Sequence, residues 1–107
     1  MGTVSAEDEL RAYAARLPVE RLLETARLAT QLSVRSLAVV TEILLPGLPG
    51  EGVPEGALDR VLDRRDELAL VMEVLELKGE VVALSEVRRL ASVVDSVVLA
   101  LGSIGGV

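Results

Sequence analysis

The chain has 107 residues and a net charge of −6 at pH 7, and half of its residues are hydrophobic. It contains no histidine, cysteine, tryptophan or phenylalanine. These absences exclude Ser-His-Asp and Cys-His catalytic groups, zinc sites built from cysteine and histidine, haem ligation by either residue, and disulfide bonds. The length fits one domain, whose core must be aliphatic.

The acidic balance also restricts the class of partner. Binding to a nucleic acid backbone needs clustered lysine and arginine, and base stacking needs aromatic residues, of which Tyr13 is the only one. We interpret the preference for arginine, ten of the eleven basic residues, as codon bias of a GC-rich bacterial genome. An acidic surface suits a basic protein partner instead. Because the first ten residues are acidic and polar, they do not resemble a signal peptide, and we expect a cytoplasmic protein.

The first predicted helix covers about residues 5–17. Ser5 and Asp8 stand at the spacing of an N-terminal capping box. Pro18 either ends this helix or occupies the first position of the next one. The apolar residues of the segment share one face: Leu10, Ala14 and Leu17.

The second predicted helix covers about residues 18–45, with Glu24 and Arg27 placed to form an ion pair one turn apart. Its apolar residues fall into two stripes, so more than half of its circumference is apolar, which is wider than a core-facing stripe needs. One stripe consists of Leu22, Ala26, Ala29, Leu37, Val40 and Leu44. The other stripe consists of Leu28, Leu32, Val39 and Ile43.

The segment 46–56 reads PGLPGEGVPEG, and its prolines and glycines exclude regular helix. It is long for a connection between two helices. We interpret it as a connecting loop, with a partner-binding element as the alternative. No phosphate-binding motif follows it.

The third predicted helix covers about residues 55–78, and Gly79 is well placed as its C-cap. The fourth covers about residues 81–101 and is expected to end at Gly102, with Ser85 as an alternative N-cap. The apolar face of this fourth helix comprises Ala83, Val87, Leu90, Ala91, Val94, Val97, Val98 and Leu101. The sequence therefore predicts an all-α fold: a small helical bundle of three long helices plus a short N-terminal helix, completed by dimerisation.

The third helix carries two apolar stripes, and the second of them motivates the prediction of a dimer. The first stripe is the expected core face: Val61, Leu68, Met72 and Leu75. The second stripe, Leu70, Val74 and Leu77, would be exposed in a lone monomer, which small monomers seldom tolerate. The rest of the chain, a second copy or an apolar ligand can each cover it. We expect a second copy related by two-fold symmetry. The candidate interface residues are Leu70, Val74, Leu77, Leu28, Leu32, Val39 and Ile43.

The acidic residues of the third helix offer two alternative sites, neither of which we favour. Asp59, Asp63 and Asp66 share a helix surface and suit a hard cation, but neighbouring arginines neutralise them. Glu73 and Glu76 stand among apolar residues, as catalytic carboxylates with raised pKa values do, but more simply they mark a solvated edge. We expect no catalytic residue, metal or cofactor.

The sequence thus favours a non-enzymatic protein-interaction module, a small acidic helical homo-oligomer that binds another protein. The alternatives are a helical carrier or sensor of an apolar small molecule or lipid, and a membrane-peripheral protein attached through the fourth helix. We do not expect a membrane-spanning helix, because Asp95 interrupts the most apolar stretch and glycines follow it.

Overall fold

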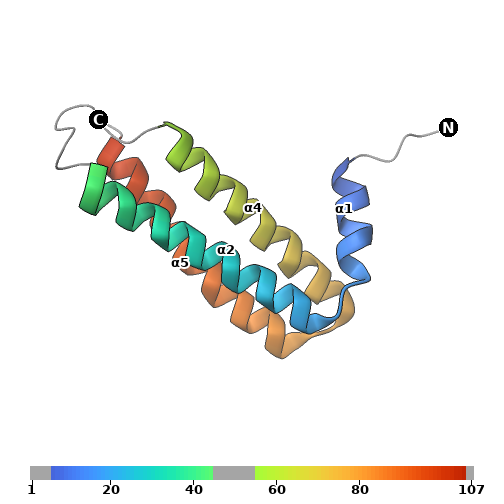
Figure 1. Cartoon of the computed structure of the whole chain (residues 1–107). Helices are drawn as coiled ribbons and strands as arrows, with labels where there is room; N and C mark the ends of the chain where they lie inside the picture. The colour runs from blue at the N-terminus through green and yellow to red at the C-terminus, as the bar shows by residue number, and fades with distance from the viewer. Residues whose placement is uncertain (1–5, 45–54, 106–107) are drawn as a thin grey trace.

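A computed structural model describes residues 6–44 and 55–105 of the chain. All the elements it contains are helical (Figure 1). They are α1 (Ala6–Ala15), α2 (Val19–Val39), the π-helical turn η1 (Val40–Leu44), α4 (Glu55–Lys78) and α5 (Val81–Gly105).

The three long helices form one bundle, in which each packs against the other two. α4 runs antiparallel to both α2 and α5, so α2 and α5 are parallel (Figure 1). α1 stands at one end of the bundle and packs against α4. The predicted fold class is therefore confirmed as three long packed helices plus a short N-terminal helix. The Cα radius of gyration is 16.0 Å, against about 13 Å expected for a compact domain of this length, so the molecule is elongated.

Buried side chains recur every three or four residues on each long helix, which is the spacing that keeps one face toward a partner helix. The structure buries Leu22, Ala26, Ala29 and Val40 of the first stripe predicted for the second helix, and Leu37 is partly buried against them. The side chain of Leu44 lies outside the described side chains. The centre of that face consists of small residues, Ala26, Ala29 and Ser33, all of them buried. The Ser33 hydroxyl donates a hydrogen bond to the Ala29 carbonyl at 2.9 Å, and Thr30 donates to Ala26 at 2.8 Å. Both buried hydroxyls are therefore satisfied within the helix.

The apolar faces predicted for the other two long helices are confirmed. On α4, Val61, Leu68 and Leu75 are fully buried and Met72 packs against them. On α5, Val87 and Val94 lie at the centre of the core. The hydrophobic side chains of the core are all aliphatic, with contributions from all three long helices and from Ala14 of α1.

The turn between α4 and α5 forms around Gly79, whose φ is +73°. The Gly79 N–H donates to the Glu76 carbonyl at 3.1 Å, and the Glu80 N–H donates to Leu75 at 3.0 Å. This pair of bonds is a Schellman motif, and a positive φ favours glycine at this position. Gly79 is thus confirmed as a C-cap.

α5 begins at Val81 as predicted, so the alternative start at Ser85 is excluded. Two local predictions were wrong. The helix was expected to end at Gly102 but continues to Gly105. Gly102 ends no helix because only Gly79 has a positive φ among the described residues. Arg27 pairs with Glu86 of α5 at 2.7 Å rather than with Glu24, because packing brings α5 closer to Arg27 than the next turn of its own helix.

The start and end of the second helix are also defined. Pro18 directly precedes α2, and its carbonyl accepts hydrogen bonds from the N–H groups of Arg21 and Leu22 at 3.0 and 3.3 Å. At the other end, the regular helix stops at Val39 and continues as the π turn η1. The Thr41 hydroxyl donates to the carbonyls of both Leu37 and Ala38, and such bonds compete with the backbone ladder and bend helices. Most of the predicted break at 46–56 lies outside the described residues.

Candidate functional site

The predicted interface stripe of α4 is divided between the core and the surface. Val74 is 0% exposed and belongs to the same core cluster as Ala14 of α1. Val74 is thus not available to a second copy, because it is buried in the core of its own chain. Leu70 is partly buried against the core, whereas Leu77 is 72% exposed.

The predicted stripe of α2 remains at the surface. Leu28 is 55% exposed, Val39 is 38% exposed and Leu32 is half-buried. The side chain of Ile43, the fourth member, lies outside the described side chains. Leu32 and Val39 therefore provide aliphatic surface beside the core, on the side of α2 that faces α4.

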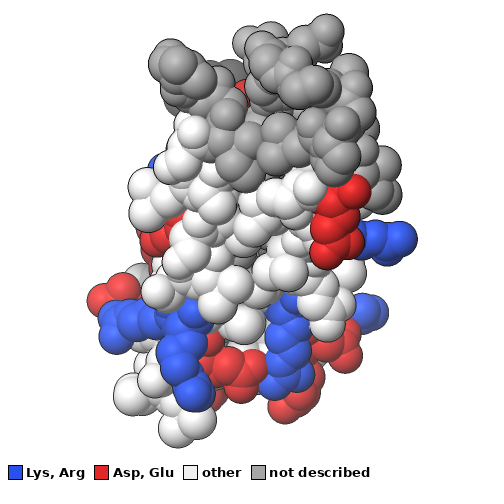
Figure 2. Space-filling view, turned by 90° about the vertical axis from the view of Figure 1, so that its left-hand side faces the viewer, with Lys and Arg blue, Asp and Glu red and all other residues white. Residues whose placement is uncertain are grey.

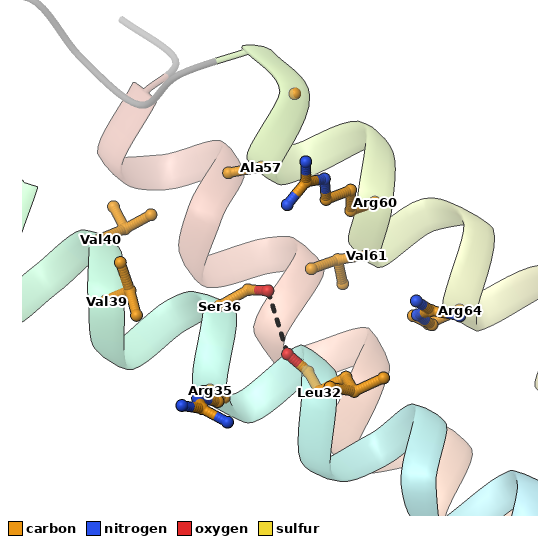
Figure 3. Close-up of a pocket in the computed structure, with 10 residues that line it drawn as sticks. Leu32, Arg35, Ser36, Val39, Val40, Ala57, Arg60, Val61 and Arg64 are labelled. Atoms are coloured by element: carbon orange, nitrogen blue, oxygen red, sulfur yellow. Dashed lines mark hydrogen bonds between the residues drawn. The ribbon is translucent and has the colours of Figure 1, made fainter.

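A groove of about 480 Å³ lies between the C-terminal half of α2 and the N-terminal half of α4, and we call it the arginine groove (Figure 3). Its apolar lining consists of Leu32, Val39, Val40, Ala57 and Val61. Three arginines also line it, Arg35 from α2 and Arg60 and Arg64 from α4, together with Ser36 and Gly56. Arg60 extends from α4 toward the space between the two helices (Figure 3). The groove thus combines an apolar floor with positive charge.

The charges of the arginine groove are only partly neutralised. Arg64 Nη1 lies 2.9 Å from Glu67 Oε1. Arg35 and Arg60 have no carboxylate within ion-pair distance in the described part of the chain. The protein as a whole has a net charge of −6, whereas the side chains of this groove carry positive charge. Sequence reasoning missed it because Arg35 is distant in the sequence from the α4 arginines.

A second groove of about 420 Å³ lies between α1 and α4, and we call it the acidic groove. Its apolar lining is Leu10, Ala69 and Leu70. Its carboxylates are Asp63, Asp66, Glu67 and Glu73. No group of three or more potential ligands within residues 6–44 and 55–105 is arranged to hold a metal ion. Asp63 and Asp66, which the sequence offered as possible cation ligands, instead belong to a negatively charged surface.

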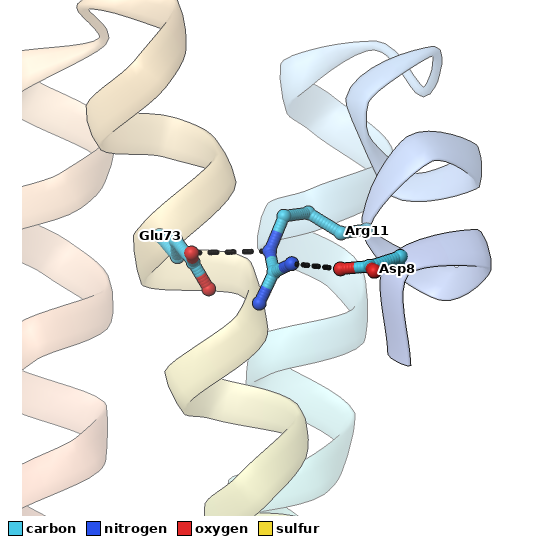
Figure 4. Close-up of polar contacts among 3 residues, drawn as sticks. All are labelled: Asp8, Arg11 and Glu73. Carbon is cyan, nitrogen blue, oxygen red and sulfur yellow. Dashed lines mark hydrogen bonds and ion pairs between the residues drawn. The ribbon is translucent and has the colours of Figure 1, made fainter. Parts of the chain in front are cut away.

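Arg11 of α1 connects this groove to the first helix (Figure 4). Its Nε atom lies 3.0 Å from Glu73 Oε1, and its Nη1 atom donates a hydrogen bond to Asp8 Oδ1 at 2.8 Å. Arg11 therefore holds α1 against α4. Glu73 and Glu76 are both exposed, so the apolar burial that the acid–base alternative requires is missing.

The two grooves meet along α4. Arg64 lines the arginine groove and Glu67 lines the acidic groove, so the ion pair between these two side chains marks the boundary. Asp63 and Asp66, on the acidic side, have no ion pair in the part of the chain that the structure describes. The surface thus places unpaired positive and unpaired negative side chains on either side of one boundary.

Exposed aliphatic side chains also occur elsewhere on the bundle. They include Val34 on α2, and Val81, Val82, Val93 and Leu99 on α5. Seen from the left-hand side of Figure 1, uncharged residues cover the middle of the described surface, and charged residues lie below them and at the sides (Figure 2). No described helix is both long and apolar enough to cross a bilayer.

Comparison of the chain with protein-family models, with curated proteins and with solved structures found no match in any of the three. The inference about function must therefore come from the grooves and from the exposed aliphatic side chains.

Proposed function

We propose that this protein is a non-enzymatic interaction module, which self-associates as a homodimer and binds other proteins through its helical surfaces. The observation that supports this proposal best is the aliphatic stripe of α2 that stays at the surface, Leu28, Leu32 and Val39. Two of its members, Leu32 and Val39, line the same groove rather than standing as scattered single residues. Contiguous apolar surface of this kind typically marks a protein–protein contact.

The shape and chemistry of the chain support the same proposal. An elongated three-helix bundle presents long, shallow faces, and helix-on-helix packing is a common way to cover them. The chain has neither histidine nor cysteine, the residues most used for acid–base and nucleophilic catalysis. Surface charges near the stripe can select a partner of complementary charge.

Solution mass tests the proposal directly. We expect sedimentation velocity and light scattering to show a dimer at micromolar concentration, and Val39→Glu, in the groove lining, to shift it toward monomer. Val34→Glu is the matched control, because Val34 is similarly exposed on the same helix but is not among the residues that line the groove. A wild-type protein that stays monomeric at these concentrations would contradict the proposal.

A second candidate function is the carriage of a small anionic amphiphile, and the arginine groove favours it. Its volume of about 480 Å³ falls within the range of small-molecule sites, about 300–1,000 Å³. An apolar floor with Arg35, Arg60 and Arg64 around it suits a carboxylate attached to an aliphatic chain. Calorimetry with decanoate tests this function, and decanol, which lacks the charge, is the control ligand. Equal binding of both compounds, or of neither, would contradict it.

A further inference from the structure

We infer that the arginine groove and the acidic groove are the two complementary halves of one self-associating surface. In this arrangement, the arginine groove of one copy receives the acidic side of α4 from a second copy, and the reverse contact forms at the same time. The inference rests on the proposed homodimer and goes further by naming the face and the contacts.

The order of charges along α4 makes the surface self-complementary. In a two-fold dimer each contact occurs twice with the roles exchanged, so a face that carries opposite charges side by side matches its own copy after rotation by 180°. The boundary lies at the Arg64–Glu67 pair, and a two-fold axis beside that pair, at Asp63, would run the two α4 helices antiparallel. Residues at equal distances from the axis then face each other, so Arg60 of one copy faces Asp66 of the second copy.

Charged side chains on both sides of the Arg64–Glu67 boundary are not used in ion pairs among the described residues. Arg35 and Arg60 have no acidic partner among the described residues, and Asp63 and Asp66 have no basic partner there. All four are exposed. Contact between the arginine groove of one copy and the acidic groove of the other would bring these opposite charges together. An arrangement in which two arginine grooves, or two acidic grooves, face each other would be repulsive. The charges thus select one orientation.

Aliphatic side chains supply the burial that charges alone do not. Exposed ion pairs contribute little to affinity, so a stable contact needs apolar surface as well. Leu32 and Val39 line the arginine groove, and Leu10 and Leu70 line the acidic groove. A standard interface buries about 800 Å² on each partner, and the principal extents of 49 × 37 × 18 Å leave room for a contact of that size.

Charge reversal followed by mixing tests the inference. Two double variants are needed: Arg35→Glu with Arg60→Glu, and Asp63→Arg with Asp66→Arg. In a dimer formed by either variant alone, side chains of like charge face each other at both copies of the contact. We expect the dimer dissociation constant of each to rise by about 100-fold or more, since like-charge juxtaposition across an interface is strongly unfavourable. Sedimentation velocity measures the change, and circular dichroism checks that each variant is folded.

Mixing the two variants in equal amounts provides the decisive observation. In the mixed dimer the reversed arginine groove faces the reversed acidic groove, and the two unaltered grooves face each other. Both contacts again join opposite charges, so we expect a heterodimer with near wild-type affinity. Arg88→Glu with Arg89→Glu is the matched control for the variant with reversed arginines, because it makes the same change in net charge at exposed positions on α5. We expect that control to remain a dimer.

The possible failures are distinguishable. A monomeric wild-type protein overturns the proposed homodimer and this inference with it. A dimeric wild type whose reversed variants also dimerise overturns the inference alone and assigns the dimer to another face. Two monomeric variants whose mixture stays monomeric contradict the reciprocal contact. A variant with reversed arginines that loses decanoate binding and keeps its dimer would assign the arginine groove to a small molecule.

Discussion

The three-helix core and the α1 attachment are held together in different ways. The core consists of aliphatic side chains that are buried from one end of the bundle to the other. α1 contributes only Ala14 to the buried set, while Leu10 is 57% exposed and Tyr13 is 64% exposed. Its link to α4 depends on Arg11, which contacts Glu73 and Asp8. The core is therefore stabilised by burial, and α1 by a small contact reinforced by charge.

This difference predicts two levels of stability within one chain. Regions with few buried apolar contacts open at lower free energy than the core does. α1 should therefore detach from α4 without unfolding the bundle. The acidic groove would open with it, since Leu10 forms part of that groove. The following substitutions test this contrast, from the largest expected effect to the smallest.

Removal of a core side chain should have the largest effect. Leu68 is fully buried on α4, so Leu68→Ala removes apolar contacts and leaves a cavity, which costs about 2–5 kcal/mol of the free energy of unfolding. Urea denaturation followed by circular dichroism measures this loss. Leu10→Ala, on α1, is the matched control and should change the same free energy very little. An equal loss of unfolding free energy in both variants would contradict the difference between the core and the α1 attachment.

Glycine substitutions test the turn that joins two of the core helices. Gly79→Ala places a side chain in a left-handed conformation, which costs about 1–2 kcal/mol. Gly102→Ala is the control, because it lies within α5 without a positive φ and a Cβ there meets no atom within 4 Å. That control should stabilise the protein by about 0.5–1 kcal/mol, since alanine is the better helix former. Thermal unfolding of both variants shows whether the signs differ.

The ion pair between α2 and α5 should contribute less than either of these. Arg27 and Glu86 are 2.7 Å apart but are both partly exposed, and exposed pairs contribute about 0.2–1 kcal/mol. A double-mutant cycle with Arg27→Ala and Glu86→Ala measures the coupling by urea denaturation. We expect it to fall within this range and to weaken at high salt. A much larger coupling energy would show that this ion pair, and not packing alone, determines how α2 lies against α5.

Loss of Arg11 should have the smallest effect on global stability and a clear local effect. Arg11→Gln removes the charge that connects α1 to Glu73, so α1 should become more mobile while the core stays folded. Tyr13 is the only aromatic residue and lies on α1, so tyrosine fluorescence anisotropy reports on this helix alone. We expect the anisotropy to fall. Arg16→Gln is the control, and an equal fall in that variant would show that Arg11 has no special role.

Local patterns in the sequence predicted the helical elements well. The third helix was expected over 55–78 and extends over Glu55–Lys78, because a proline-rich break precedes it and Gly79 follows it. The three-to-four spacing of apolar residues identified the buried faces of α4 and α5, since that spacing follows from the helical repeat. Gly102 was misleading because glycine only permits a helix to end, and here the helix continues to Gly105.

Features that join distant segments were predicted poorly. Val74 was expected at an interface but is buried within the chain, in a core that segments distant in the sequence complete. Glu24 was the expected partner of Arg27, yet the closer carboxylate comes from α5. Neither groove was predicted, since Arg35 and Arg60 join one surface, and Leu10 and Asp63 another, only after the helices pack.

The sequence by itself thus determined the all-α class, the positions of the helices and an aliphatic core. These follow from short-range propensities, capping and periodicity, which depend on residues close together in the chain. Only the tertiary structure decided which of the two apolar stripes of α2 is buried, where α1 lies, and how charges of opposite sign came to lie on either side of the Arg64–Glu67 pair. Those outcomes depend on how the helices rotate against one another, and no single helix determines that rotation.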